Sequence, residues 1–387
     1  MAVNSRLYSV IFFLISIYIQ ACLAYTELSG SSLKSIPRPG KSFDIHDGDM
    51  LSPILIPRVS GTEGNEKVRR FLASYFTEQL PKWKVTYQNS TSKTPATGNR
   101  DVPFVNVIVR RDPPWASEGH TSYLTLVAHY DSKLTPRNFI GATDSAAPCA
   151  MLLYIAKAID SAIETKWSRT KGDLETMRLE SENNRGIQIL LLDGEEAFES
   201  WTEKDSIYGA RSLAAEWETT FHPALSTYRN PIQSIEMFVL LDLLGAKGPK
   251  IPSYYKLTHW LYQKMAKLEG RMRTLELLHS SPNHKKRSDE RRAAEPMFFY
   301  ETEKKDSDQW MGEYIDDDHR PFLERGVDIF HIIATPFPRF WHEPEDDGLH
   351  LHMDTTEDWA ILMTAFTAEY MDLADFMPQG KQTRDEL

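Results

Sequence analysis

Short, almost wholly apolar runs recur along the chain and predict strands that are buried on both faces. The clearest is residues 187–192, where Ile-Gln-Ile is followed by three leucines. Comparable runs cover residues 123–128, 235–242 and 329–333. Runs of this length and composition are typical of the inner strands of a largely parallel sheet. We therefore expect these segments to form the centre of an α/β fold.

Amphipathic segments lie between these runs and predict helices. Apolar residues at helical spacing favour helices over residues 63–80, 149–159, 254–278 and 359–376. A further helix is expected to follow the loop that starts at Trp201. By contrast, residues 166–185 are highly charged and irregular, so we expect a solvated excursion there.

Two segments that precede the first inner strand alternate apolar and polar residues. Val85 and Tyr87 alternate in one, and Val105, Val107 and Val109 alternate in the other. This period predicts a pair of strands with one buried face, and we expect them to form the antiparallel edge of the sheet. Together the elements predict an α/β three-layer sandwich, in which a mixed, mostly parallel central sheet is flanked by helices. We expect residues 63–380 to form a single domain, preceded by an arm over residues 25–62.

The composition fits a globular protein and argues against a nucleic-acid partner. Of 387 residues, 41% are hydrophobic, which is ample for a large core, and the net charge of −11 is spread along the chain. A basic stretch at residues 283–295 contains no interleaved aromatic residues, so a nucleic-acid patch is not expected there.

Both ends of the chain predict a location in the secretory pathway. Residues 1–24 combine an early arginine, an apolar run and small residues, which indicates a signal peptide cleaved after Ala24. The last four residues, Arg-Asp-Glu-Leu, are similar to the signal that returns proteins to the endoplasmic reticulum. We therefore expect the lumen of the endoplasmic reticulum, with partial secretion. A retained membrane anchor is the alternative, but we expect no stable membrane association after cleavage.

Covalent features are few in the expected mature chain. Of the two cysteines, Cys22 falls inside the expected signal, which leaves Cys149 without an intrachain partner. One glycosylation sequon begins at Asn89, in what the sequence predicts to be a polar loop. The stability of the protein is therefore expected to come from its core.

Acidic residues and histidines follow several of the predicted inner strands. His129 and Asp131 come after the first, Glu195 and Glu196 after the central one, and Asp242 after the next. Because sites of open α/β sheets lie at the carboxyl ends of the strands, these side chains are expected to share one crevice.

Three residues at the ends of separate segments could hold a metal ion. Asp144 lies in a turn of small residues, Glu196 follows the central strand, and His342 lies in a loop rich in proline and aromatic residues. Imidazole and carboxylate are zinc ligands, and a catalytic zinc site takes three protein ligands and leaves one position open. Each residue alone is weak support, but the set predicts a zinc site.

Seven motifs in order along the chain resemble those of the animal and fungal glutaminyl-peptide cyclotransferases. The similarity extends over roughly residues 63–376, and the motifs are His129–Lys133, Gly141–Ala146, Asp193–Phe198, Asp205–Arg211, Leu240–Ala246, Asp317–His319 and the segment from Pro336 to His342. The resemblance implies the fold that this family shares with the zinc aminopeptidases of family M28. It also implies conversion of the N-terminal glutamine of peptides and proteins to pyroglutamate, with release of ammonia.

The resemblance assigns a role to each matching position. It implies one zinc per chain, bound by Asp144, Glu196 and His342, with Glu195 as the acid/base catalyst. The remaining positions are implied to place the substrate amine and relay protons, or to hold the glutamine side chain. The first group is Asp242 and Asp317, and the second is Ile315, Phe337 and Trp341, while Trp201 is implied to be a mobile aromatic residue at the mouth of the site.

Two positions depart from the pattern of the family. Ala128 stands where secreted vertebrate members have a cysteine, so the implied disulfide to Cys149 is absent. Asp316 stands where a glutamine is common, which adds a negative charge beside the expected site.

Two other functions are consistent with some of these residues. His129 and Asp242 are positioned like ligands of a second metal, which would make the chain a two-zinc aminopeptidase. A binding protein that has lost its metal is the other alternative, although Asp144, Glu195 and Glu196 are all present. Trp201, residues 208–210 and residues 337–342 favour the cyclotransferase, because a peptidase does not require them.

Overall fold

A mixed six-stranded sheet forms the middle layer of the computed structural model, which describes residues 25–172, 184–284, 295–312 and 314–378. The strand order is β1-β2-β4-β3-β5-β6. β4, β3, β5 and β6 run parallel, whereas β1 and β2 pair antiparallel at one edge and β2 also pairs antiparallel with β4. The strands are Lys84–Lys93, Asp101–Arg111, Ser122–His129, Arg185–Leu192, Ile235–Asp242 and Ile329–Ile333 in chain order. The predicted three-layer α/β sandwich is confirmed.

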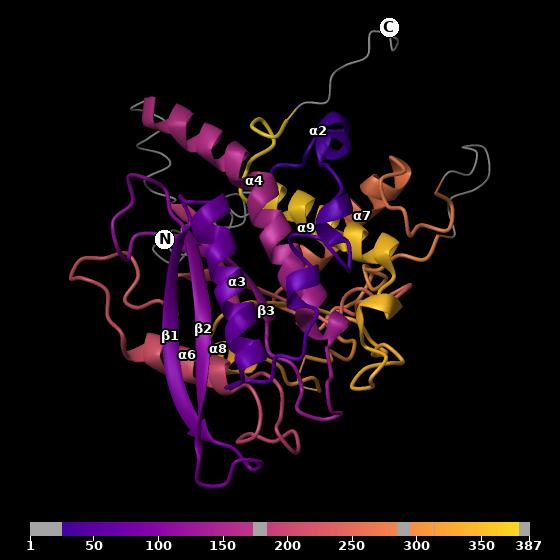
Figure 1. Ribbon diagram of the computed structural model, residues 1–387. Helices are drawn as coiled ribbons and strands as arrows, with labels where there is room; N and C mark the ends of the chain where they lie inside the picture. The colour runs from indigo at the N-terminus through magenta and orange to yellow at the C-terminus, as the bar shows by residue number, and fades with distance from the viewer. Residues whose placement is uncertain (1–24, 173–183, 285–294, 313, 379–387) are drawn as a thin grey trace, which may run out of the picture.

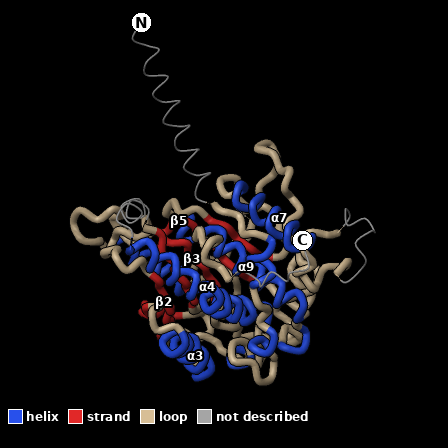
Figure 2. The backbone as a smooth tube through the Cα atoms, turned by 90° about the horizontal axis from the view of Figure 1, so that it is seen from above, coloured by secondary structure: helices blue, strands red, loops and turns tan. Residues whose placement is uncertain are grey.

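Alternating side chains of the strands enter two separate cores. Leu126 and Ile189 point into the larger core, which contains residues of α3 (Glu63–Gln79), α4 (Ala147–Gly172), α7 (His259–Thr274) and α9 (Met353–Tyr370). Val127 and Leu190, their neighbours in sequence, point into the other core with α6 (Tyr208–Thr219) and residues beside α8 (Arg320–Leu323). This two-sided burial explains why the inner strands are apolar throughout. Figures 1 and 2 show the helices packed around the sheet.

Helix α4 is longer than its sequence pattern predicts. Residues 166–172 continue the helix, although a solvated excursion is expected there, because Trp167 and Thr170 remain buried while residues 168 and 169 between them face outward. Residues 173–183 lie outside the described part. Residues 142–171 are long and apolar enough to cross a membrane, yet 78% of their apolar window is buried inside the fold, as expected of a core helix.

The other helices confirm the predicted positions with shifted bounds. α3 begins after Thr62, whose hydroxyl accepts a hydrogen bond from the backbone N–H of Asn65 (3.4 Å). α9 begins at Met353, before the expected start, because His352 caps it in the same way. α7 is shorter at both ends than residues 254–278.

The strand β1 corrects the expected position of the sequon. Asn89 lies inside β1, opposite Val105, and not in the loop between the strands. The strand extends to Lys93 because its residues pair with the whole length of β2. Asn89 is nevertheless exposed, since this strand is the outer edge of the sheet.

The arm before α3 packs on the domain and reaches the site loops. It contains the short helices α2 (Gly30–Ser35), η1 (Gly40–Phe43) and η2 (Ser52–Ile54). The side chain of Arg58 is fully buried and donates to the carbonyl oxygens of Tyr130 (2.6 Å) and Gly141 (3.1 Å). The arm thereby fixes the segments after β3.

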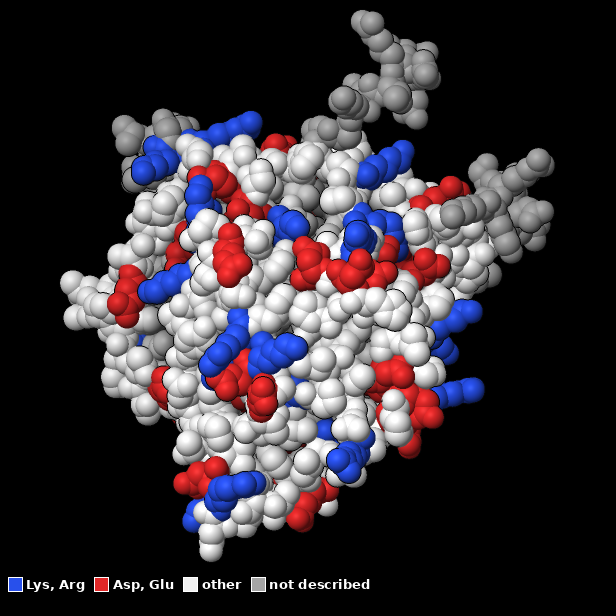
Figure 3. Space-filling view, viewed as in Figure 1, with Lys and Arg blue, Asp and Glu red and all other residues white. Residues whose placement is uncertain are grey.

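Charges of both signs are interspersed on the face shown in Figure 3. Glu66 and Arg70 pair one helical turn apart on α3, and Arg111 pairs with Glu164 at 2.7 Å. An exposed pair such as that of Glu66 and Arg70 contributes little to stability, whereas the guanidinium of Arg111 is buried. Elsewhere in the described residues, Cys149 is a buried free thiol that donates to the carbonyl oxygen of His129 (3.1 Å).

Candidate active site

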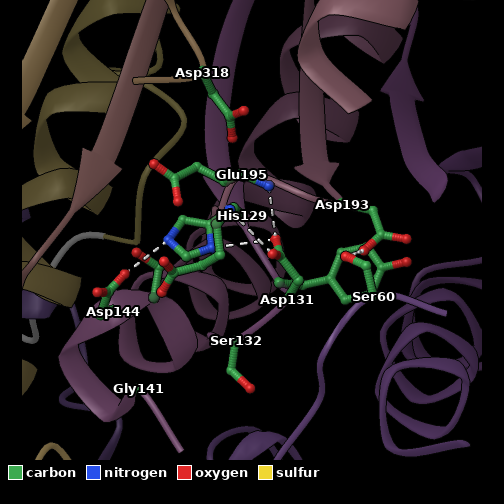
Figure 4. Close-up of polar contacts among 12 residues, drawn as sticks. Ser60, His129, Asp131, Ser132, Gly141, Asp144, Asp193, Glu195 and Asp318 are labelled. Carbon is green, nitrogen blue, oxygen red and sulfur yellow. Dashed lines mark hydrogen bonds and ion pairs between the residues drawn. The ribbon is translucent and has the colours of Figure 1, made fainter. Parts of the chain in front are cut away.

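The parallel strands deliver the candidate residues to one edge of the sheet. β3 ends at His129, Glu195 and Glu196 follow β4, and β5 ends at Asp242. Figure 4 shows His129, Asp144 and Glu195 turned toward one another at this edge. The structure thus brings the strand-end acids into one crevice, as the sequence predicts.

Asp144, Glu196 and His342 converge from three separate segments. The Nε2 of His342 lies 3.4 Å from Oδ2 of Asp144 and 3.5 Å from Oε2 of Glu196. One ligand atom from each residue lies within 4.8 Å of the other two. Oε1 of Glu196 is buried and has no hydrogen-bond partner among the described residues. Two carboxylates and an imidazole at these separations, with an oxygen left unpaired, fit a divalent cation such as zinc.

An acid from the C-terminal part of the chain holds the backbone beside Asp144. Asp346 accepts hydrogen bonds from the backbone N–H (2.8 Å) and the hydroxyl (3.0 Å) of Thr143. Gly141 makes the turn before Asp144 at φ +60°, where a Cβ would lie 2.1 Å from the Asp144 carbonyl oxygen. Because Asp346 comes four residues after His342, these bonds join two of the three candidate ligand segments.

Aromatic rings orient the imidazole of His342. Its ring stacks on that of Trp341 with 3.8 Å between centroids, and Phe139 meets it edge-on at 6.2 Å. Phe337 in turn packs against Trp341 at 4.9 Å. Hydrogen bonds to Asp144 and Glu196 outweigh burial and raise the pKa of His342 to about 9. The imidazole is therefore held toward the two carboxylates.

Asp131 fixes the turn that carries the two adjacent glutamates. Its carboxylate oxygens accept hydrogen bonds from the backbone N–H of Glu195 (3.1 Å) and of Glu196 (3.2 Å), as Figure 4 shows for this carboxylate. With the backbone held, the two side chains leave in different directions. Glu196 reaches His342 and the Nζ of Lys133 (3.4 Å), whereas Glu195 faces the cleft.

The carboxylate of Glu195 is poised to hold a proton. Only 6% of the residue is exposed, and its side chain makes no hydrogen bond with the described residues. Burial raises its pKa well above that of an ordinary glutamate, and Asp317 and Glu196 add to the rise while His129 opposes it. A carboxyl group whose pKa is raised in this way is suited to act as a general acid and as a general base.

His129, Asp144 and Asp242 form a second converging group. The Nε2 of His129 lies 3.0 Å from Oδ1 of Asp144 and 3.5 Å from Oδ1 of Asp242. Asp242 also accepts a hydrogen bond from the hydroxyl of Ser145, and burial raises its pKa to about 6. These are the positions that a second metal would require, so the geometry alone does not separate the two candidate enzymes.

Acids on the far side of the cleft form a third cluster. His331, in the middle of β6, lies 2.8 Å from Oδ2 of Asp317 and holds that carboxyl's pKa below its usual range against the effect of burial. Both carboxylate oxygens of Asp318 are buried without a hydrogen-bond partner among the described residues. Burial and then Asp317 raise the pKa of Asp318 well above normal. Asp317 is therefore the ionised member of this pair.

A cleft of about 350 Å³ opens over these groups. The three residues expected to hold the substrate side chain line it, and so do Trp201, Lys133, Leu243 and Tyr314, the last three of which the sequence does not single out. Trp201 and Trp341 stand at its rim, 40% and 38% exposed. The expected members of the wall are Ile315, Phe337 and Trp341, and Trp201 is the residue expected at the mouth. The cleft therefore combines an aromatic wall with an acidic floor.

Several positioning residues have no assigned role in the sequence interpretation. Asp131 and His331 lie in segments noted for other reasons, but only the folded backbone places them against Glu195 and Asp317. Ser145 and Asp346 likewise act across 97 and 203 residues. A local motif gives no sign of partners at such separations.

Several carboxylates are buried together at this site. Asp131, Asp144, Glu196 and Asp317 are each nearly fully buried within this one region. Buried carboxylates are stable only when they are paired, protonated or bound to a cation. The site as built therefore fits a bound metal ion.

Comparison with known proteins places this fold and site in a class. The model of peptidase family M28 matches residues 106–367. A glutaminyl-peptide cyclotransferase-like protein of Bos taurus is 37% identical over 90% of this chain and 82% of its own length. The glutaminyl-peptide cyclotransferase of Drosophila melanogaster is 34% identical over 90% and 87%. The crystal structure of the Macrostomum lignano glutaminyl cyclase superimposes with a TM-score of 0.67, at 28% identity, over 89% of this chain and 92% of that one.

The chain belongs to the glutaminyl-peptide cyclotransferases of peptidase family M28. The family resemblance that the motifs imply is thereby confirmed over most of the chain, and the fold is that of the solved glutaminyl cyclase.

Proposed function

We propose that this protein converts the N-terminal glutamine of peptides and proteins to pyroglutamate, with release of ammonia. The observation that carries the proposal is a buried Glu195, without a hydrogen-bond partner among the described residues, beside Asp144, Glu196 and His342 at the floor of an aromatic cleft. The named activity of the relatives supports it. The two-zinc aminopeptidase is not favoured, because relatives that match most of this chain carry the name of glutaminyl-peptide cyclotransferases.

We assign Asp144, Glu196 and His342 to one zinc ion. When bound, zinc would polarise the γ-carbonyl of the glutamine side chain and stabilise the negative charge that develops on its oxygen. The unpaired Oε1 of Glu196 and the convergence of the three ligand atoms support this assignment. Asp346 and Asp131 hold the ligand segments in place.

Glu195 is assigned the proton transfer. The α-amine nitrogen attacks the γ-carbonyl carbon, a new C–N bond closes the five-membered ring, and the bond to the side-chain nitrogen breaks. Glu195 accepts a proton from the attacking amine and delivers it to the departing nitrogen, which leaves as ammonia. The raised pKa of its buried carboxyl suits both halves of this transfer.

The remaining residues position the substrate. Asp242 and Asp317 lie beside Glu195 and are assigned to bind the α-amine and pass protons. His331 keeps Asp317 ionised for this task. The aromatic wall of the cleft is assigned to the methylene groups of the glutamine side chain, because its rings exclude water around the reacting amide.

The direct test uses a synthetic peptide that begins with glutamine. Purified protein should release ammonia and lower the peptide mass by about 17 Da, the mass of one ammonia molecule. A chelator should abolish this reaction until zinc is restored. A protein that removes the first residue instead, giving a free amino acid, would be an aminopeptidase. If the zinc-loaded protein forms neither ammonia nor a free amino acid, both assignments are refuted.

We also propose that the protein works in the lumen of the endoplasmic reticulum as a glycoprotein. Its support is the signal-like residues 1–24 and the last four residues, all outside the described part, with the exposed Asn89. Deleting the last four residues should increase secretion and leave activity unchanged. An unchanged distribution between cell and medium would show that the tail is not read.

A further inference from the structure

A second hollow adjoins the catalytic cleft. Its volume is about 650 Å³, and it lies between the loop after Trp201, the start of α6 and the segment around α8. Trp201 and Asp316 line both the cleft and this groove. Both side chains are substantially exposed, so the two spaces meet at the rim.

The three arginines that line the groove differ in how they are paired. Arg320 lies 3.2 Å from a carboxylate oxygen of Glu324, and Arg325 lies 2.9 Å from one of Glu218. Arg211, on the first turn of α6, forms no ion pair with a carboxylate of the described residues. Its guanidinium therefore still has donors for an incoming anion.

The contacts of Arg211 hold it at the wall of the groove. The guanidinium donates to the backbone carbonyl oxygens of Glu203 and Lys204, and it lies 5.0 Å from the centre of the Tyr208 ring. These contacts use some of the N–H donors of the guanidinium and fix the direction of the group. A guanidinium held in this way loses little freedom when it binds a carboxylate.

We propose that this groove binds the residues that follow the N-terminal glutamine, and that Arg211 selects an acidic side chain among them. The inference rests on the proposed function, which places the glutamine itself in the adjoining cleft. An extended peptide advances about 3.3–3.4 Å per residue, so the third to fifth residues of a substrate span roughly 7–10 Å along such a groove. The substrates that the groove favours are therefore peptides with an acidic residue shortly after the first two residues.

Asp316 makes the preference depend on position. Its carboxylate is half exposed at the junction of cleft and groove, and its only ion-pair partner among the described residues is Arg320, at 3.7 Å. An acidic second residue would pass beside this carboxylate and be repelled. The gain from an acid is therefore confined to positions beyond the second.

The test compares peptides that share an N-terminal glutamine and differ at one later position. In a five-residue series otherwise of alanine, one glutamate or one lysine is placed at position two, three, four or five, and kcat/KM is measured with the zinc-loaded protein. At its best position beyond the second, glutamate should exceed lysine by roughly 2- to 5-fold, since an ion pair of this exposure contributes up to about 1 kcal/mol. The readout is this ratio, which cancels any general loss of activity in a variant.

Variants of Arg211 test the assignment. Arg211→Lys should keep most of the preference, Arg211→Gln should abolish it, and Arg211→Glu should reverse it in favour of lysine. The matched control is Arg229→Gln, which removes the same charge from an exposed position outside the groove and should leave the ratio unchanged.

The outcomes separate this inference from the proposed function. If ammonia is released from every peptide at the same rate, or if Arg211→Glu keeps the wild-type preference, the groove does not select acids and the inference is wrong while the proposed function stands. If no glutamine peptide is cyclised by the zinc-loaded protein, the proposed function itself fails.

Discussion

Asp358 in helix α9 and Glu195 after strand β4 are both buried carboxylates, yet they differ in whether the fold supplies hydrogen-bond partners. Asp358 is fully buried and accepts hydrogen bonds from Arg38 (2.8 Å) and from the backbone N–H groups of His279 (2.9 Å) and Ser280 (2.7 Å). Glu195 has no comparable partner in the described residues, and burial raises its pKa well above normal. A buried carboxylate with hydrogen-bond partners stabilises the fold. A buried carboxylate without them destabilises it, and its presence therefore indicates a function.

The largest effect is expected from exchanging each of these acids for its amide. Glu195→Gln should keep its zinc and its fold and lose a factor on the order of 10² to 10⁴ in kcat, because proton transfer is lost. Asp358→Asn should do the reverse: kcat stays near that of the wild type, while the free energy of unfolding falls by about 1–3 kcal/mol. Zinc analysis, kcat and denaturant unfolding of both variants give the comparison. The proposed difference between the two acids is wrong if Glu195→Gln loses its metal or keeps the kcat of the wild type.

Glu196→Gln sharpens the contrast between adjacent residues. Since Glu196 faces His342 and Asp144, this variant should lose zinc affinity by more than the roughly 10- to 100-fold typical of outer-shell partners. Activity should return in part when zinc is added in excess. Competition with a chelator measures the affinity, with Glu195→Gln as the matched control. Wild-type affinity in Glu196→Gln would remove it from the ligand set.

Asp193 is an intermediate case and predicts a pH dependence of stability. It accepts hydrogen bonds from Ser60 (2.7 Å) and Asn65 (2.9 Å), but burial and Asp131 raise its pKa to about 6. A raised pKa in the folded state favours the protonated acid, so its contribution is complete below about pH 4 and is lost as pH rises through 6. Relative to Asp193→Asn, the wild type should lose stability on the order of 2 kcal/mol between pH 4 and 7. A difference that does not vary with pH would contradict this.

The smallest effect is expected at the rim of the cleft. Trp201 is 40% exposed, so Trp201→Ala should raise KM for a short glutamine peptide by roughly 5- to 10-fold and change kcat little, as loss of uniform binding does. A fall in kcat with unchanged KM would instead place the indole at the reacting atoms. Phe221→Ala, an exposed aromatic residue outside the cleft, is the matched control.

The sequence predicts the inner strands and the strand ends that carry the site residues, because burial on both faces leaves a continuous apolar run. Asp144, Glu195 and Glu196 are recognisable for the same reason, since each stands where an apolar run or small-residue turn ends. The extent of α4 is harder to predict, because Trp167 and Thr170 bury one stripe within a stretch that is otherwise charged. Periodicity over so short a segment is easily masked.

Positioning contacts across the chain could not be predicted from the sequence. Asp346 reaches Thr143 across 203 residues, and Arg58 binds the carbonyl oxygens of the segments after β3. Neither pair has a local pattern, because the partners meet only after the sheet has formed. The position of Asn89 in β1 depends in the same way on pairing with β2.

The most direct test of the account is a zinc titration of metal-free protein, in which ammonia release from a glutamine peptide is followed as zinc is added. One site formed by Asp144, Glu196 and His342 predicts that activity rises linearly and reaches its full value at about one zinc per chain. Activity that needs a second equivalent would bring His129 and Asp242 into the metal site, and the account of a single-zinc cyclotransferase would be contradicted. Absence of ammonia release at any zinc concentration would contradict it as well.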